Sequence, residues 1–104
     1  MTSIFTKIIN REIPARIEYE DELCIVIHDI HPKAPVHLLL VPKKEIPTIM
    51  DVHDEDQLLL GHLILVARNM GKKLGLEGYK LVYNVGEKGG QEIFHIHLHL
   101  LGEK

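Results

Sequence analysis

Three histidines alternate with single aliphatic residues near the C-terminal end of the sequence, at positions His95, His97 and His99. Alternation of polar and apolar residues is typical of a β-strand with one buried face. We therefore predict a strand over residues 94–101 that presents the three imidazoles on one face, with neighbours about 6.5–7 Å apart. A neutral imidazole can act as a nucleophile, and a charged one can stabilise phosphate oxygens. The arrangement predicts chemistry on an anionic substrate.

A glycine-containing loop, Gly86–Gln91, leads directly into the histidine segment. Glycines allow backbone N–H groups to approach and surround an anion. Many hairpin turns are rich in glycine, so the loop alone says little. Combined with the three histidines that follow, it favours an anion such as phosphate.

Two other interpretations of the histidines remain open. The side chains could decorate a solvent-exposed face, or they could bind a transition metal, because imidazole is a ligand of zinc, copper and nickel. However, no carboxylate or thiol at short spacing completes a ligand set in the sequence. We therefore expect no metal and no other cofactor.

Two further polar residues accompany apolar strands. His37 lies within Val36–Val41, which is otherwise aliphatic, and a buried polar side chain is costly without a partner. We predict that His37 pairs with one of the three imidazoles on a neighbouring strand. Asp29 follows an apolar segment and precedes a proline-containing loop, so it could bind a ligand or form a turn.

The hydrophobic pattern predicts a short helix, a long helix and five strands. The long helix begins at Asp54, which has the spacing of a capping box with Gln57, and it ends before Gly75. Its predicted buried stripe comprises Leu59, Leu63, Val66, Met70 and Leu74. The short helix covers residues 4–10, and the strands cover residues 15–20, 23–28, 36–41, 79–84 and 94–101. This order predicts an α+β fold with a five-stranded, mainly antiparallel sheet.

The size and charge of the chain argue against several classes of protein. Its 104 residues predict a single domain over residues 1–104 with one core. The net charge is −3 without a basic run, so nothing suggests a nucleic-acid surface. No apolar run is long enough to span a bilayer. The one cysteine, Cys24, lies in an apolar run, where we expect a core role. We expect a cytoplasmic protein that binds neither nucleic acid nor membrane.

The glycine loop and the histidines form a motif from Gly89 to His99 that resembles the signature of the histidine triad (HIT) family, and most of all its Hint-type branch. Further blocks in the same order extend the resemblance over nearly the whole chain, at residues 4–9, 12–15, 28–30, 34–37, 41–44 and 59–63. The resemblance implies a HIT-like fold and a homodimer whose two sheets join into one. It also implies a hydrolase that cleaves the P–N bond of purine nucleoside phosphoramidates, or related adenylylated compounds, and releases a nucleoside monophosphate such as AMP.

By position, the resemblance implies catalytic roles for four histidines. His97 matches the nucleophile that forms a nucleotidyl-histidine intermediate, and His99 matches the histidine that contacts the phosphate. His95 and His37 match the pair that supports the nucleophile from behind. The implied nucleotide-binding residues are Asp29 for the ribose, Ile27 and Ile30 for the base, and Asn84, Gly90, Gln91 and Glu92 for the phosphate.

Two features depart from the family pattern. Glu92 stands where this branch usually has serine or threonine, so a hydroxyl contact to the phosphate is lost and a carboxylate could repel it. The sequence has no tryptophan, whereas family members often carry a further C-terminal segment with a tryptophan that reaches the neighbouring site. The alternative function is a nucleotide-binding or partner-docking module with little turnover. A dinucleoside polyphosphate hydrolase of the same superfamily is a weaker alternative.

Overall fold

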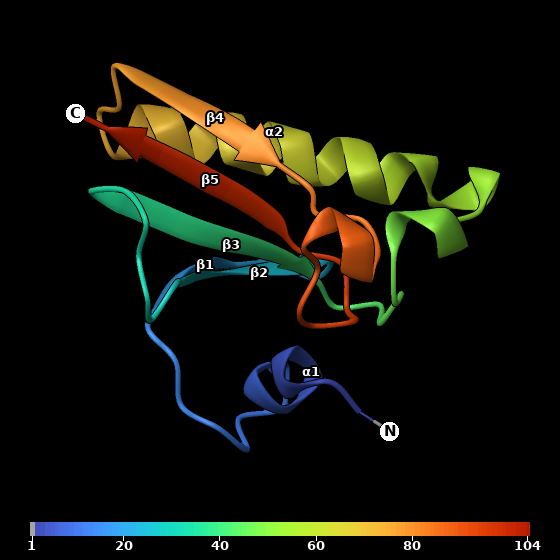
Figure 1. Ribbon diagram of the computed structural model, residues 1–104. Helices are drawn as coiled ribbons and strands as arrows, with labels where there is room; N and C mark the ends of the chain where they lie inside the picture. The colour runs from blue at the N-terminus through green and yellow to red at the C-terminus, as the bar shows by residue number, and fades with distance from the viewer. Residues whose placement is uncertain (1) are drawn as a thin grey trace.

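The computed structural model describes residues 2–104, in which five strands form one sheet and every neighbouring pair is antiparallel (Figure 1). The strand order is β1-β2-β3-β5-β4. The strands are β1 (Ile17–Glu20), β2 (Cys24–His28), β3 (Val36–Pro42), β4 (Gly78–Val82) and β5 (Leu98–Glu103). The remaining elements are helices α1 (Ile4–Ile9) and α2 (Gln57–Lys73) and the 3₁₀ turns η1 (Ile49–Asp51), η2 (Asp54–Asp56) and η3 (Glu87–Gly89). The predicted α+β class, with one short and one long helix, is confirmed.

The two helices lie on opposite faces of the sheet, so the central strand β3 is buried on both sides (Figure 1). Side chains of a strand alternate between its faces. Leu38 and Leu40 belong to the core cluster that packs against α2. Leu39 and Val41 belong to a second cluster that contains Phe5 of α1. This explains why β3 is almost wholly apolar, and why its polar residue needs a partner.

Helix α2 begins at Gln57, after a turn of 3₁₀ helix, so the predicted start at Asp54 with a capping box to Gln57 was wrong. Asp56 takes the anchoring role instead. One of its carboxylate oxygens accepts from the backbone N–H of His53 at 2.9 Å, and the other lies 2.6 Å from Nζ of Lys44. These contacts tie the start of α2 to the chain that leaves β3.

The apolar stripe of α2 is confirmed in its central part. Leu63, Val66 and Met70 are buried, whereas Leu59 and Leu74 at the ends are half-buried. Within residues 2–104 the structure has no helix with the length and apolar character needed to cross a membrane. Cys24 is buried in the core cluster under α2, as predicted, and burial raises the pKa of its thiol to about 12.

Strand β5 begins at Leu98, so the predicted strand over residues 94–101 was wrong for residues 94–97. The backbone of this segment bonds outside the sheet. The N–H of Ile96 donates to the carbonyl of Ile46 at 2.8 Å, and the carbonyl of His95 is bonded to the ring of His97. Residues 94–97, which include His95 and His97, therefore lie outside the sheet, and the chain enters it at Leu98.

Candidate active site

A cavity of about 340 Å³ lies on the face of the sheet that carries α1. Predicted site residues that line it are Asp29, His37, Asn84, Gly90, Glu92, His97 and His99. Residues that sequence reasoning did not single out are Phe5, His31, Lys33, Leu39, Lys80, Val82, Ile93 and Leu101. His95, Gln91, Ile27 and Ile30 do not line the cavity.

The sheet register brings His37 and His99 together. His99 of β5 pairs with Leu39 of β3, so it shares a face with His37, two residues before Leu39. Nε2 of His37 lies 3.0 Å from Nδ1 of His99. The predicted pairing of His37 with one of the three imidazoles is confirmed, and its partner is His99.

The proton positions on this pair follow from the partners. The backbone N–H of Lys33 donates to Nδ1 of His37 at 3.1 Å, so that nitrogen carries a lone pair. In the neutral ring the proton is then on Nε2, and it is donated to Nδ1 of His99. Neutral His99 must therefore carry its own proton on Nε2, which makes it a hydrogen-bond donor.

His97 has the opposite tautomer. Its Nδ1 lies 2.8 Å from the carbonyl oxygen of His95, which can only accept a hydrogen bond, so Nδ1 carries the proton. Nε2 of His97 therefore has a free lone pair. The ring centroids of His97 and His99 are 4.9 Å apart, and both residues line the cavity. A nucleophilic nitrogen and a donor N–H thus stand side by side.

Burial keeps these rings neutral. It lowers the pKa of His97 and of His37 below the ordinary value of 6.5. Burial, together with the neighbouring charges of His97 and His37 when protonated, lowers the pKa of His99 to about 4. Charged imidazoles are disfavoured in a space of low polarity. The neutral tautomers described above are therefore the ones expected near pH 7.

His95 does not line the cavity and precedes β5, so the prediction that all three imidazoles lie on one face of a strand was wrong for this residue. It is fully buried. Its Nε2 donates to the carbonyl of Pro42 at 2.8 Å, and its Nδ1 lies 2.6 Å from Oγ of Ser3. Phe5 meets the rings of His95 and His97 edge-on, with centroids 5.7 Å and 5.0 Å away.

The loop before β5 is held in shape by Gln91, which is buried rather than exposed to the cavity. Its side chain accepts from the N–H of Gly86 at 2.9 Å and donates to the carbonyls of Pro47 and Ile93 at 2.7 and 2.9 Å. Gly90 has φ +89°, a conformation that favours glycine. These bonds hold residues Gly86–Gln91, the glycine turn, at the rim of the cavity.

Two more residues complete that rim. The amide of Asn84 donates to the carbonyl of Gly89 at 3.0 Å, which ties the end of β4 to the glycine turn. Glu92, whose residue type departs from the family pattern, is exposed and lines the cavity. The structure therefore places a carboxylate beside the glycine turn.

Asp29 forms a turn and also lines the cavity, while ligand binding by Asp29 stays a prediction. Oδ1 accepts from the backbone N–H of His31 at 2.7 Å and forms a turn, while the residue lines the cavity at the end far from Asn84. Ile27 is buried on β2 opposite Leu39, which does line the cavity. Ile30 is 85% exposed and lies away from the cavity lining.

Two groups in residues 2–104 bring metal-ligating atoms within 4.8 Å of one another. One is Asp29 with His37 and His99, and the other is Asp21 with Cys24 and His62. In the first group the facing nitrogens of the two histidines share one proton in a hydrogen bond. A metal ion bound by this group would have to replace that bond.

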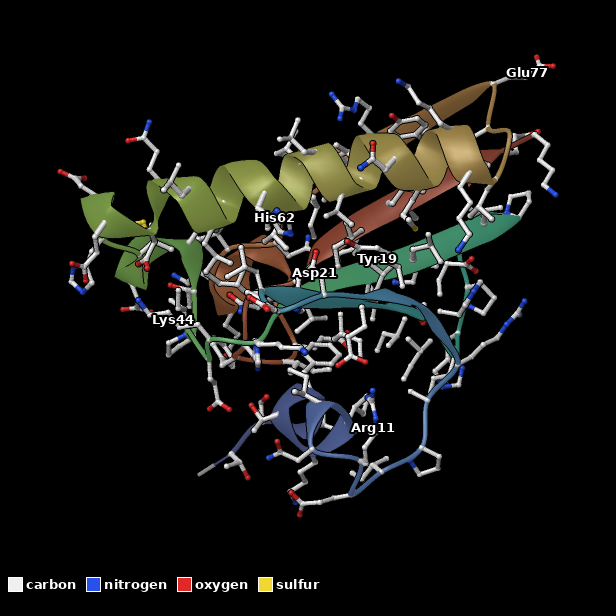
Figure 2. All side chains as sticks on the ribbon, turned by 180° about the vertical axis from the view of Figure 1, so that it is seen from behind. Arg11, Tyr19, Asp21, Lys44, His62 and Glu77 are labelled. Atoms are coloured by element: carbon white, nitrogen blue, oxygen red, sulfur yellow. The ribbon has the colours of Figure 1, made fainter. Side chains whose placement is uncertain are left out.

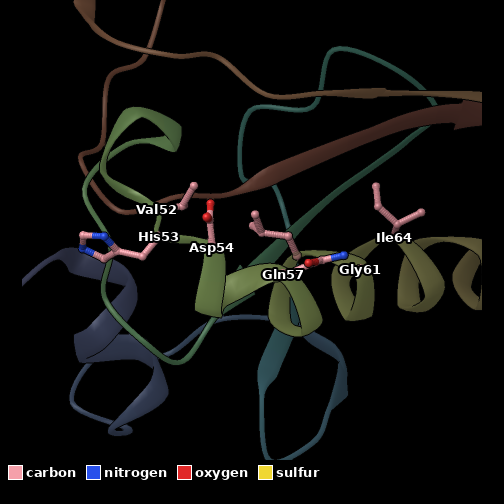
Figure 3. Close-up of a pocket in the computed structure, with 7 residues that line it drawn as sticks. Val52, His53, Asp54, Gln57, Gly61 and Ile64 are labelled. Atoms are coloured by element: carbon pink, nitrogen blue, oxygen red, sulfur yellow. The ribbon is translucent and has the colours of Figure 1, made fainter.

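A second hollow, about 600 Å³ in volume, lies at the beginning of α2 and shares no lining residue with the first cavity (Figure 3). Its lining comprises Val52, His53, Asp54, Gln57, Leu60, Gly61 and Ile64. It lacks the paired imidazoles and the glycine turn. We therefore take the smaller, histidine-lined cavity as the candidate active site.

An α+β fold whose antiparallel sheet carries paired imidazoles next to a glycine turn defines a recognisable class of protein. Comparison with known proteins identifies that class. The model of the HIT domain family matches residues 10–104, and the chain belongs to this family. An uncharacterized HIT-like protein of Synechocystis is 52% identical over 101 residues, which are 96% of this chain and 89% of the relative.

A relative with a named activity and a solved structure support the same assignment. The purine nucleoside phosphoramidase of Escherichia coli is 47% identical over 102 residues, which are 96% of this chain and 86% of the relative. The crystal structure of a HIT family hydrolase from Legionella pneumophila superposes with a TM-score of 0.96. It is 48% identical and covers 99% of this chain and 94% of its own.

Proposed function

We propose that this protein hydrolyses the P–N bond of purine nucleoside phosphoramidates, or related adenylylated compounds, through a nucleotidyl-histidine intermediate. The observation that carries the proposal is the pair of opposite tautomers on His97 and His99 in one cavity. The named activity of the Escherichia coli relative supports the choice of substrate.

In the first step, the lone pair on Nε2 of His97 attacks phosphorus. A bond from phosphorus to the imidazole forms, the bond from phosphorus to the amine breaks, and the amine leaves with a proton taken from solvent. The ring becomes cationic, and the carbonyl of His95, 2.8 Å from Nδ1, stabilises the proton that remains there. In the second step, water attacks phosphorus, the bond from phosphorus to the imidazole breaks, one proton of the water passes to solvent, and the nucleoside monophosphate leaves the neutral imidazole.

The remaining residues are proposed to hold the nucleotide. His99 donates its Nε2 proton to a phosphate oxygen, and the glycine turn at Gly90 with Asn84 offers further donors. Asp29, at the other end of the cavity, is placed to bind the ribose hydroxyls. The proposed base site lies at Leu39, which lines the cavity and pairs with the buried Ile27 of β2, whereas Ile30 lies outside the cavity lining.

The test is turnover of an adenosine phosphoramidate by wild type and by His97→Ala. Loss of the nucleophile is expected to lower kcat by on the order of 10⁴-fold or more. His53→Ala, which removes an exposed imidazole outside the cavity, is the matched control and is expected to keep the wild-type rate. Trapping a nucleotidyl adduct on His97 by mass spectrometry adds a direct readout. Equal rates for wild type and His97→Ala would disprove the assigned role.

A second candidate function is nucleotide binding with little turnover, and the position of Glu92 favours it. A carboxylate on the cavity wall opposes the approach of an anionic phosphate. Titration with a purine monophosphate, run beside the turnover assay, separates the two functions. Binding without hydrolysis would select the binding module.

We also propose that the protein forms a homodimer through β4 and α2. Strand β4 is at the edge of the sheet, and its Tyr79 and Leu81 are 39% and 36% exposed. On α2, Gly61 and Ile64 lie on the stripe that continues to Gly71, which touches the ring of Tyr79. Pairing of two β4 strands would join two sheets and cover this stripe.

A further inference from the structure

We propose that Ser3 is a positioning residue for His97: its hydroxyl fixes the tautomer and orientation of His95, whose carbonyl in turn holds the ring of His97. The catalytic meaning of this inference rests on the proposed function. Ser3 is far from the histidines in sequence, and nothing in the histidine motif points to it. The contact exists only because α1 packs on the sheet face that carries the cavity.

The direction of the hydrogen bond between Ser3 and His95 follows from elimination. Nε2 of His95 lies 2.8 Å from the carbonyl oxygen of Pro42, which has no proton, so Nε2 carries one. Burial lowers the pKa of His95, so the ring is neutral and Nδ1 has a lone pair. Oγ of Ser3, 2.6 Å from Nδ1, must therefore donate its proton to the ring.

The other contacts of Ser3 leave its hydroxyl proton free for this purpose. Oγ accepts from the backbone N–H of Thr6 at 3.0 Å, so Ser3 is also the N-cap of α1. The backbone N–H of Ser3 donates to Oε1 of Glu45 at 3.0 Å, and the hydroxyl of Thr6 donates to the same carboxylate oxygen. Oγ of Ser3 is 3.4 Å from Oγ1 of Thr6, well beyond its distance to His95.

The link from His95 to the reacting nitrogen is short. The carbonyl of His95 accepts the Nδ1 proton of His97 at 2.8 Å, which leaves the lone pair on Nε2. Phe5, in the first turn of the helix that Ser3 caps, meets both rings edge-on. Ser3 thus contacts His95 directly through its hydroxyl. It also caps the helix whose Phe5 packs against His97.

Loss of the hydroxyl would leave Nδ1 of a fully buried ring without a donor. An unsatisfied buried acceptor is costly, so the ring is expected to change tautomer or rotate. Either change disturbs its bond to Pro42 and the position of its own backbone carbonyl. A small misplacement of a reacting group can cost a large factor in rate. The step that suffers is attack by His97, whereas the nucleotide-binding residues are untouched.

Three substitutions separate the donor role of Ser3 from its role as a helix cap. Ser3→Ala removes both roles, and we expect kcat to fall roughly tenfold with KM nearly unchanged. Ser3→Thr keeps a hydroxyl and is expected to restore kcat. Ser3→Asp keeps an acceptor for the N–H of Thr6 but has no proton for Nδ1 of His95, so we expect a stable helix without rescue of kcat. Thr2→Ala, which removes a neighbouring exposed hydroxyl, is the control with wild-type kcat.

A spectroscopic readout keeps the test independent of activity. In ¹⁵N-labelled wild type we expect Nε2 of His95 to be protonated and Nδ1 to be a hydrogen-bonded acceptor, with the Nδ1 signal shifted in Ser3→Ala. Finding the proton on Nδ1 of His95 in wild type would overturn the proposal, and so would equal rescue by Ser3→Asp and Ser3→Thr. If wild type fails to hydrolyse any phosphoramidate, the proposed function fails, whereas the ¹⁵N signals still decide the contact.

Discussion

Nε2 of His62 on α2 lies 2.6 Å from Oδ2 of Asp21 in the turn between β1 and β2, which joins the hairpin to the long helix (Figure 2). The same oxygen accepts from the hydroxyl of Tyr19 at 2.8 Å, and the other accepts from two backbone N–H groups of the turn. The carboxylate of Asp21 thus connects strand β1, the β1–β2 turn and helix α2. His62 is part of this connection.

We expect Asp21→Ala to lower the free energy of unfolding by about 2 kcal/mol, because it leaves several donors without their acceptor. Urea unfolding measures the change, and Glu22→Ala, which removes the adjacent exposed carboxylate, is the control. Burial alone would raise the pKa of Asp21, but hydrogen bonds from Leu23, Tyr19, His62 and Cys24 lower it well below 3.8.

The sign of the pH effect follows from that lowered pKa. The unfolded chain protonates Asp21 more readily than the folded one does, so the stabilisation is complete above pH 4–5 and is lost as pH falls towards the folded pKa. The difference in stability between wild type and Asp21→Ala should therefore be constant near neutrality and shrink in acid. A difference that grows as the pH falls would contradict this assignment.

The acid limb of the activity profile should lie below pH 6.5. Burial lowers the pKa values of both His97 and His99, the latter to about 4, so the nucleophile and its neighbouring donor stay neutral at mildly acidic pH. We expect the midpoint of the acid limb of kcat/KM to lie below pH 6.5. A profile that halves at or above pH 6.5 would show that the rings titrate as if they were exposed.

His99→Ala should lower kcat less than His97→Ala does. Removing one donor to a developing anion typically costs about 10²–10³-fold, whereas removing the nucleophile abolishes the covalent route. Single-turnover kinetics measure the difference. In His99→Ala, a nucleotidyl adduct on His97 should still form, but slowly. An adduct that forms at the wild-type rate would exclude a role for His99 in stabilising the phosphate.

Glu92→Ser should raise kcat/KM for a phosphoramidate about tenfold, because it removes a negative charge from the wall that faces the phosphate. The gain should shrink as salt is added, since exposed charges are screened. Glu87→Ser, an exposed carboxylate on the same loop outside the cavity lining, controls for a general change in charge. No gain in Glu92→Ser at low salt would mean that this carboxylate does not oppose the substrate.

If β4 forms the dimer contact, Leu81→Asp should convert the protein to a monomer in multi-angle light scattering. A charge at this edge opposes strand pairing. Leu23→Asp tests the opposite edge of the sheet, in the β1–β2 turn, where a 45%-exposed leucine is replaced without touching β4. Dissociation by Leu23→Asp, or an intact dimer in Leu81→Asp, would place the contact elsewhere.

The sequence determined the fold class and the presence of the two helices and five strands. An apolar run predicted β3, alternation predicted the later part of β5, and the costly burial of His37 predicted its imidazole partner. These conclusions depend on local periodicity and on the need of a buried polar group for a partner, both of which are visible in a linear chain.

The tertiary structure decided which of the three imidazoles line the cavity and which ring nitrogen of each carries the proton. The alternation of residues 94–101 predicted three rings on one face of a strand. However, the strand begins only at Leu98, and α1 covers His95. The tautomers of His97 and His99 depend on a carbonyl and on a neighbouring ring. The contact of His37 with His99 joins residues that are distant in sequence, and so does the contact of Ser3 with His95. No local pattern encodes the direction of a hydrogen bond that forms only when separate elements pack together.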